Sequence, residues 1–266
     1  MTNNAEFTRG VLYSKQSAEQ YTLVRQKPCG HLSGVIETFW SVNWDLPAEQ
    51  PHIQENIPDP CVNIVFEGGS ARVIGAVTKR YTVSLEGKGE LFGVKFRPGG
   101  FFQLSKSSVS ILTDKTELID NSFGTPGIEL ANNIAKAKCV DDMVQYCQHF
   151  FGPRIHGSSA EVDKINAIIN VLATDPSITR VDDLSNAVGL SGRSLQRLFK
   201  QQVGVSPKWL IRKHRIQEVL SQLERGQNDW QSLISELGYF DQSHFIKDFV
   251  ELVGVTPEAY LSKLTG

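Results

Sequence analysis

The chain has 266 residues, a formal net charge of −2 and an ordinary composition, with 21% charged and 40% hydrophobic residues. Its length suits two domains, each with its own core, and excludes neither enzymes nor binding proteins. No segment approaches the roughly 20 apolar residues of a membrane span and no signal peptide is visible, so we expect a cytoplasmic protein with no membrane partner.

The first part of the chain, up to about residue 151, has the pattern of a β-rich domain with flanking helices. Short runs of β-branched and aromatic residues lie between Gly, Pro and Asn over residues 34–97 and predict strands, as in 62–66 and 92–96. After Pro98 a short helix is expected over 101–104. Apolar residues spaced by three or four predict further helix over 128–151.

A segment rich in turn-forming residues separates this part from the rest. It contains Pro153, Gly157, Ser158 and Ser159. We therefore expect an N-terminal sensing or dimerisation domain at 1–152, a linker at 153–160 and an all-α domain at 161–266. The predicted fold class is α+β, with the β-rich domain followed by helices.

Four scattered cysteines give no sign of a disulfide framework or a metal site. Cys29, Cys61, Cys139 and Cys147 form no C-x-x-C pair, and we expect buried thiols. Cys29 and Cys61 have no compact metal-ligand spacing with the nearby histidines, so no metal is predicted. An alkyl-accepting or redox-sensing role for these two cysteines is left open.

No motif for catalysis or for a cofactor is present. The chain lacks a phosphate-binding glycine fingerprint, a G-x-S-x-G sequence and an H-E-x-x-H sequence. We therefore predict a protein that is not an enzyme, with no catalytic residue and no cofactor. Arg97 is a candidate for contact with an anionic effector or, alternatively, with a buried carboxylate, and the effector site is otherwise unknown.

The C-terminal part reads as a series of short helices. Residues that can cap a helix precede each apolar-periodic segment. These are Ser158 with Glu161, Thr179 with Asp182, Ser191, Ser206 before Pro207, Asn228 or Asp229, and Asp241. The longest helix, from Pro207 to about residue 224, would measure about 27 Å at 1.5 Å per residue.

A degenerate repeat organises these helices into two similar units. The sequence VGVSP at residues 203–207 returns as VGVTP at 253–257, and Gly189 and Phe199 have counterparts in Gly238 and Phe249. Two short helices joined at a glycine turn form a helix-turn-helix, which places its second helix in the major groove of DNA. The long helix would hold the two units near the ~34 Å groove repeat of B-DNA. Two units in one chain can therefore address two consecutive grooves.

The first unit has a strongly basic surface despite the negative net charge. Residues 193–215 include seven Lys or Arg and no Asp or Glu. We predict that the second helix of this unit contacts DNA, the alternative being an ordinary solvated helix face. The predicted contacts are Ser191, Arg193, Ser194, Gln196, Arg197 and Lys200, joined by Arg212 on the long helix. Each basic residue of 212–215 is equally a candidate for pairing with Glu218 or Asp182.

The second unit is expected to bind phosphate more weakly. Residues 236–258 include five acidic residues against Lys247 alone. The residues predicted to face DNA are Gln242, Ser243, His244 and Lys247. Its acidic residues are expected to face the N-terminal domain, another subunit or RNA polymerase.

This double unit closely resembles the DNA-binding domain of AraC/XylS-type bacterial transcription regulators. The resemblance covers residues from about 161 to 264. It lies in Asp183-Leu184-Ser185, in Gly189-Leu190-Ser191 with Arg193, Leu195, Arg197 and Phe199, in Gly204-x-Ser206-Pro207, and in residues 238–245 and 254–257. It implies a two-headed DNA reader attached to a sensing or dimerising domain. Gly192 and residues 246–248 depart from the usual pattern of the family.

These observations predict a sequence-specific DNA-binding transcription regulator, an effector-responsive activator by family analogy. Double-stranded DNA is the predicted partner, and a small-molecule effector, RNA polymerase and a second copy of the chain are further candidates. The alternative is a DNA-repair or thiol-based alkyl-transfer or redox protein tethered to DNA by its C-terminal domain. A small-molecule carrier with a vestigial DNA module is a third reading, which the basic surface disfavours.

Overall fold

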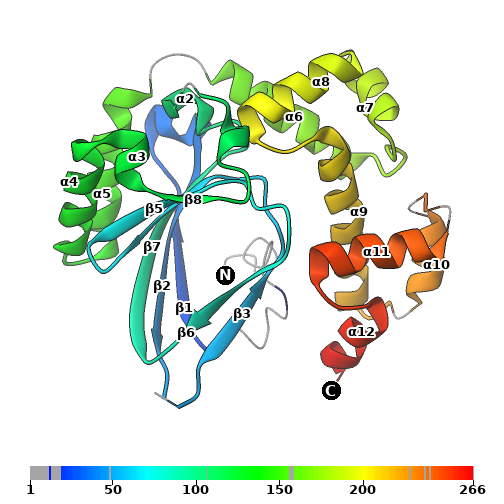
Figure 1. The fold of residues 1–266 in the computed structure, drawn as a ribbon, viewed down its shortest axis with the longest axis horizontal. Helices are drawn as coiled ribbons and strands as arrows, with labels where there is room; N and C mark the ends of the chain where they lie inside the picture. Colours follow the sequence, from blue (N-terminus) through cyan, green and yellow to red (C-terminus); the bar gives the residue numbers. More distant parts are fainter. Residues whose placement is uncertain are drawn as a thin grey trace.

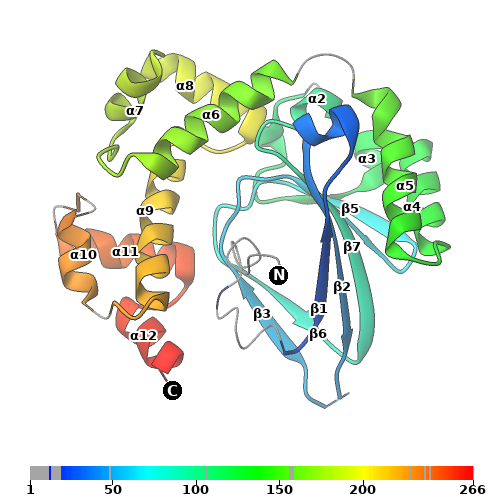
Figure 2. The same ribbon diagram turned by 180° about the vertical axis from the view of Figure 1, so that it is seen from behind.

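The computed structural model describes residues 12, 19–47, 49–105, 107–155, 159–227, 229–236, 238–239 and 241–265. A β-rich N-terminal part lies beside an all-helical C-terminal part (Figures 1 and 2). This arrangement confirms the predicted α+β fold class. Two of the predicted helix caps, Ser158 and Asn228, lie outside the described residues.

The strands of the N-terminal part pair in antiparallel fashion. The larger sheet has the order β1-β2-β7-β4-β5-β8, and β3 pairs with β6 in a separate ribbon. The strand bounds are β1 Thr22–Gln26, β2 Ile36–Asp45, β3 His52–Asn56, β4 Asn63–Glu67, β5 Ser70–Ile74, β6 Tyr81–Leu85, β7 Lys88–Phe96 and β8 Thr116–Leu118. All lie within or just beside the region predicted as strand, except β1 and β8.

One face of the larger sheet carries the core of the N-terminal part. Ile64 pairs with Val94 and Phe66 with Phe92, and all four side chains are buried. Helices α2 (Phe102–Ser105), α3 (Ile119–Phe123), α4 (Thr125–Ala135) and α5 (Val140–Phe151) lie on this side (Figure 1). The helical spacing over 128–151 is therefore divided between α4 and α5, and the short helix predicted near 101–104 is confirmed as α2.

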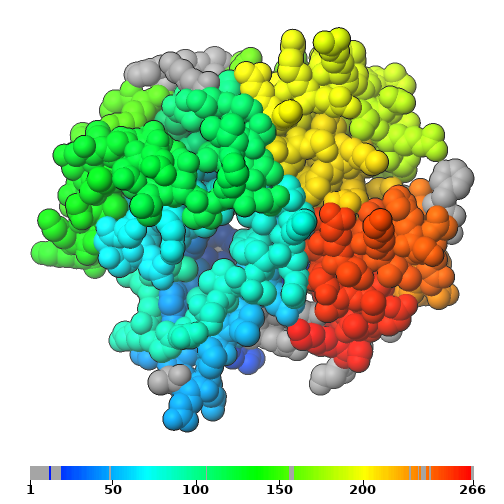
Figure 3. All heavy atoms as spheres, viewed as in Figure 1, coloured from blue at the N-terminus to red at the C-terminus, as the bar shows by residue number. Residues whose placement is uncertain are grey.

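The opposite side of the sheet lines a large open cavity of about 2770 Å³. Trp40 and Trp44 of β2 lie over Gly93 and Gly89, their cross-strand partners on β7. A Cβ atom at Gly93 would come within 2.1 Å of the Trp40 ring, so glycine is needed there. The space-filling view is hollowed over the N-terminal part (Figure 3).

The C-terminal part is a chain of helices in which α9 forms the long connection (Figure 1). The bounds are α6 Ala160–Thr174, α7 Val181–Val188, α8 Gly192–Leu198, α9 Pro207–Glu224, α10 Trp230–Glu236, α11 Gln242–Val253 and α12 Pro257–Thr265. A π-helical segment, η5, spans Phe199–Val203 directly after α8. The predicted long helix from Pro207 to residue 224 is confirmed as α9.

Cysteine burial follows the prediction at two positions out of four. Cys61 and Cys147 are buried, whereas Cys29 and Cys139 are exposed, so the expectation of buried thiols is wrong for the latter pair. The Cys29 thiol donates to Oε1 of Gln148, on α5, at 2.6 Å. None of the helices in the described part of the chain is long and apolar enough to cross a membrane.

Candidate nucleic-acid interface

The first helix-turn-helix consists of α7 and α8 with a glycine turn between them. Gly189 ends α7 with a φ of +66°, a left-handed conformation that favours glycine. The predicted capping box at Thr179 and Asp182 is wrong by one residue. Asp183, rather than Asp182, accepts hydrogen bonds from the backbone N–H groups of Thr179 and Arg180, at 3.1 and 2.8 Å.

Ser191 caps α8, as predicted. As the second helix of its unit, α8 is the recognition helix, called the reading helix below, and α11 is its counterpart in the second unit. The Ser191 hydroxyl accepts from the backbone N–H of Ser194 at 3.2 Å, which satisfies one of the free donors at the start of α8. Leu195 and Phe199 are fully buried, so α8 has a fixed inner side. The Ser191 hydroxyl donates to that of Ser194 at 2.9 Å.

The predicted DNA-contacting residues of the first unit gather on the outer side of α8 and the start of η5. Arg193, Gln196 and Arg197 are exposed, as are Ser191 before the helix and Lys200 after it, and Ser194 is half-buried. Two guanidinium groups and one amide on a single short helix match the groups that recognise guanine, adenine and phosphate.

The second unit consists of α10 and α11. Asp241 accepts from the backbone N–H of His244 at 2.7 Å, which confirms the predicted cap. The four predicted contacts of α11 are all exposed, while Phe245 and Phe249 on its inner side are fully buried. These exposed residues are Gln242, Ser243, His244 and Lys247.

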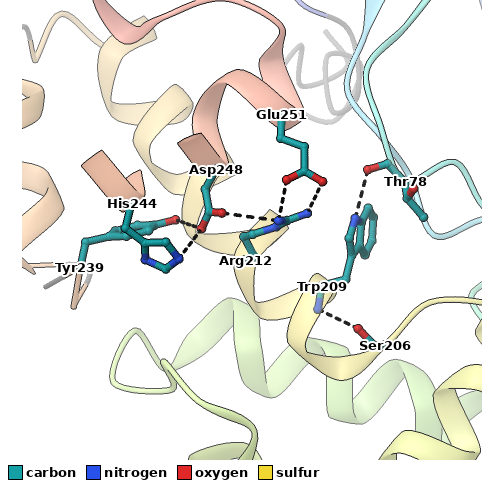
Figure 4. A network of polar contacts seen from close by, with 8 residues as sticks. All are labelled: Thr78, Ser206, Trp209, Arg212, Tyr239, His244, Asp248 and Glu251. Atoms are coloured by element: carbon teal, nitrogen blue, oxygen red, sulfur yellow. Dashed lines mark hydrogen bonds and ion pairs between the residues drawn. The ribbon is translucent and has the colours of Figure 1, made fainter. Parts of the chain in front are cut away.

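Arg212 lies in an ion-pair network instead of standing free on α9 (Figure 4). Its guanidinium donates to both carboxylate oxygens of Glu251, at 2.8 and 3.1 Å, and to Asp248 at 3.4 Å. Asp248 is buried and also accepts from the Tyr239 hydroxyl at 3.4 Å. Two acidic residues of α11 therefore face α9, and not the N-terminal domain or another partner as we expected.

Arg215 and Lys213 are also turned away from the outer surface. The Arg215 guanidinium lies 3.5 Å from the centre of the Tyr239 ring, a cation–π contact. Lys213 lines the cavity together with Asp59 and Lys95 of the N-terminal part. Of the seven cations in residues 193–215, Arg193, Arg197, Lys200 and Lys208 remain on the exposed surface.

A charged cluster at the junction of the two parts had no assignment from the sequence. Lys95 on β7 is 2.7 Å from the Asp59 carboxylate and 3.2 Å from that of Glu37. Burial alone would raise the pKa of Asp59, but the ammonium groups of Lys95 and Lys213 hold it well below its usual range. Burial lowers the pKa of Lys213, against the opposing effect of Asp59.

Arg97 bridges the two parts of the chain. Its guanidinium donates to Asp163, at the start of α6, at 3.3 Å, and 35% of the Arg97 side chain is exposed. A carboxylate partner, one of the two alternatives for this residue, is therefore present, although the pair is only partly buried.

Comparison with known families gives separate matches to the two parts. Residues 24–117 match a domain of unknown function, DUF6597, and residues 184–263 match a helix-turn-helix domain. An uncharacterised HTH-type transcriptional regulator of Haemophilus influenzae is 27% identical over 94 residues, which is 35% of this chain and 32% of that protein. The chain thus spans about a third of the length of this curated relative.

The solved structures that the comparison finds include several of ToxT from Vibrio cholerae. One crystal structure is 14% identical, with a TM-score of 0.38, and the match covers 93% of this chain and 98% of that one. A structure of ToxT bound to an unsaturated fatty acid is 13% identical, with a TM-score of 0.37, and the match covers 97% and 96%. The present chain thus resembles a helix-turn-helix protein in its C-terminal part and a domain of unknown function in its N-terminal β-rich part.

Proposed function

We propose that this chain is a sequence-specific DNA-binding transcription regulator that places α8 and α11 in consecutive major grooves of one duplex. The proposal keeps the division into a sensing or dimerisation domain at 1–152, a linker at 153–160 and a DNA-binding domain at 161–266. It includes a cytoplasmic location and no catalytic role. The observation that carries it is the outer side of α8, where Arg193, Gln196 and Arg197 are all exposed.

The two reading helices are expected to contribute unequally. The four exposed cations of the first unit and the start of α9 face no acidic residue of their own segment. In the second unit Lys247 is the exposed cation of α11, and the exposed Asp241 caps the same helix. Phosphate attraction should therefore come mainly from the first unit, while α11 adds contacts to bases.

A response to a small molecule is the second half of the proposal. The cavity is lined by both parts of the chain, with Trp40 and Lys95 on the sheet side and Asn166, Lys213 and Gln217 on α6 and α9. A ligand that contacts both sides would bind one relative placement of the two parts more tightly than others, and could thereby change DNA affinity. Activation of transcription, contact with RNA polymerase and dimerisation belong to the same proposal.

Gel-shift experiments with a duplex recovered by in vitro selection test the DNA-binding half. Replacing both Arg193 and Arg197 by Ala should abolish specific binding, because it removes two bidentate donors worth about 1–3 kcal/mol each. Replacing Gln242 and His244 by Ala should weaken binding more modestly. Equal losses from the two pairs would contradict the asymmetry.

A charge-matched control separates recognition from simple loss of positive charge. Arg72 on β5 and Arg225 after α9 are both exposed and lie outside the two reading helices. Replacing both by Ala removes the same net charge as the Arg193 and Arg197 pair. This control should retain specific binding.

The alternative of a thiol-based transferase is not supported by the environment of Cys61. Burial, and next the nearby Asp59 carboxylate, raise the pKa of the Cys61 thiol well above its ordinary value. A thiol of this kind stays protonated at neutral pH and is a poor nucleophile. Alkyl transfer from modified DNA to the purified protein, lost on replacing Cys29 or Cys61, would restore that alternative.

A further inference from the structure

The N-terminal part contacts the two helix-turn-helix units at equivalent turns. Gly204 and Gly254 belong to the repeated VGVSP and VGVTP sequences, fifty positions apart, and both have positive φ, +91° and +87°. Each glycine lies after the reading helix of its unit, in the turn that leads to the next helix. Contacts at these turns therefore fix where the C-terminal ends of the two reading helices lie.

The turn of the first unit is held by the segment between α2 and β8. The Thr113 hydroxyl donates to the Gly204 carbonyl oxygen at 2.7 Å. A Cβ atom at Gly204 would lie 2.9 Å from the Thr113 hydroxyl and 3.3 Å from Val109, so a side chain at this position would crowd both residues. In the next turn of the chain, the Trp209 indole N–H donates to the Thr78 carbonyl oxygen at 3.1 Å (Figure 4).

The turn of the second unit meets the segment that begins at Thr78. A Cβ atom at Gly254 would come within 2.3 Å of Nε of Arg80. Arg80 is also ion-paired with Glu55 at 3.2 Å, and Glu55 pairs with Lys263 of α12 at 3.3 Å. Residues 78–80 therefore contact the start of α9, directly after the first turn, through Thr78, and the turn of the second unit through Arg80.

Asp114 connects these two sets of contacts. Its carboxylate accepts from the backbone N–H of Thr78 at 2.7 Å and from the Thr78 hydroxyl at 2.6 Å. It directly follows Thr113, which binds Gly204. Asp114 is also the sole non-glycine residue of the described chain with a positive φ, +56°. This conformation costs about 1 kcal/mol and persists only where the surroundings require it.

We propose that Asp114 is a positioning residue for DNA recognition, through which the N-terminal part holds both glycine turns and sets the spacing between the two reading helices. Helix α9 alone would leave the units free to bend about its two ends. Residues 78–80 and Thr113 connect the two units a second time, through the N-terminal part. This second connection restricts bending of the units about the ends of α9. This inference rests on the proposed function, because it concerns how two reading helices share one duplex.

The test measures half-site spacing, which a merely stabilising residue would not alter. Shifting one half-site by one base pair moves it by about 3.4 Å and rotates it by about 35°. Two reading helices held at a fixed spacing should therefore bind the shifted site much more weakly. In vitro selection from a random duplex library should give wild-type sites with one fixed spacing. Asp114→Gly suits the positive φ but removes the carboxylate. Its selected sites should contain the same half-sites at several spacings, with the preference against a one-base-pair shift at least about threefold lower.

Matched variants assign the effect to these contacts. Asp114→Asn keeps oxygen and nitrogen atoms for both Thr78 contacts and tolerates positive φ, so it should retain the wild-type spacing. Thr113→Val and Arg80→Gln should broaden the spacing, whereas the exposed neighbours give Thr116→Val and Lys79→Gln as controls that should not. If Asp114→Gly does not fold, judged by circular dichroism, the Thr113 and Arg80 variants decide the question.

The outcomes separate this inference from the proposed function. If the folded variants select sites with the same single half-site spacing as the wild type, Asp114 does not position the reading helices. Wild-type sites that contain a single half-site would also overturn the inference while leaving DNA binding intact. A wild-type protein that enriches no sequence at all would contradict the proposed function itself.

Discussion

At the scale of single residues, the Asp59 carboxylate lies beside the ammonium groups of Lys95 and Lys213 at the junction of the two parts. Its pKa is depressed, so its contribution to stability is complete above the unfolded value of about 3.9 and is lost as pH falls through the lower folded value. Asp59→Asn leaves Lys95 without its nearest partner and should cost about 1.5–3 kcal/mol at pH 7. Urea unfolding at pH 7, 5 and 3 should show this difference shrinking only below pH 4.

The control for Asp59 is an exposed aspartate with a similar partner. Asp45 lies 3.7 Å from Lys88, and both side chains are more than three-quarters exposed. Asp45→Asn should change the free energy of unfolding by less than about 0.5 kcal/mol. Equal effects of the two substitutions, or a difference that does not depend on pH, would show that the Asp59 cluster does not stabilise the junction.

The residues of the reading helices could be predicted from the sequence because the patterns that identify them lie within a few adjacent positions. Ser191 and Asp241 stand directly before an apolar-periodic segment, and the structure places both at helix caps. The partners of Arg212, Lys213 and Asp59 could not be predicted in this way. They come together only when α9 packs on α11 and lies across the cavity from the sheet, and nothing in the sequence distinguishes such a side chain from an ordinary surface charge.

At the scale of an element, α9 is a structural helix on the side that carries Arg212. Arg212→Met would leave the buried Asp248 without its nearest cationic partner, with the imidazole of His244 at 4.0 Å, and should cost about 3 kcal/mol in free energy of unfolding. The salt dependence of DNA binding should stay the same, since this guanidinium is already paired. The exposed Lys208 is the matched position, and Lys208→Met should leave stability unchanged.

Arg212 remains a predicted DNA contact, and this pair of variants tests it. A guanidinium that holds a phosphate contributes about 0.9 to the slope of log K against log salt. A loss of that size in Arg212→Met, without loss of stability, would return the residue to the DNA-binding surface. The same measurement on Lys208→Met gives the change in slope expected for the loss of one phosphate contact.

The start of α11 gives a second test at this scale. Asp241→Ala leaves the backbone N–H of His244 without its acceptor and should lower the free energy of unfolding by about 1 kcal/mol. Asp241→Asn keeps an acceptor oxygen and should be nearly neutral. Chemical denaturation measures both, and a loss in the Asn variant as large as in the Ala variant would assign the effect to charge and not to capping.

At the scale of the whole molecule, the strand order and the junction could not be predicted from the sequence. The alternation of apolar residues identified β4 and β7 as strands, but their pairing places residues 63–66 against 92–95 and depends on tertiary packing. The separate β3–β6 ribbon carries residues close to Arg80 and the second unit. The repeat in the C-terminal part was visible because each unit is a short, local motif, whereas the contacts that hold the two units come from the other part of the chain.

The number of exposed cations in residues 193–215 should determine how steeply DNA binding by the whole protein falls with salt. Seven phosphate contacts from residues 193–215 would give a slope of about −6.3, whereas the four exposed cations give about −3.6, and Lys247 on α11 can extend this to about −4.5. Binding to a non-specific duplex between 50 and 200 mM salt measures this slope. Replacing Arg193 and Arg197 by Ala should reduce its magnitude by about 1.8. A wild-type slope near −6 would mean that two of Arg212, Lys213 and Arg215 leave their present partners on DNA, and a flat response would remove the electrostatic basis for binding at this surface.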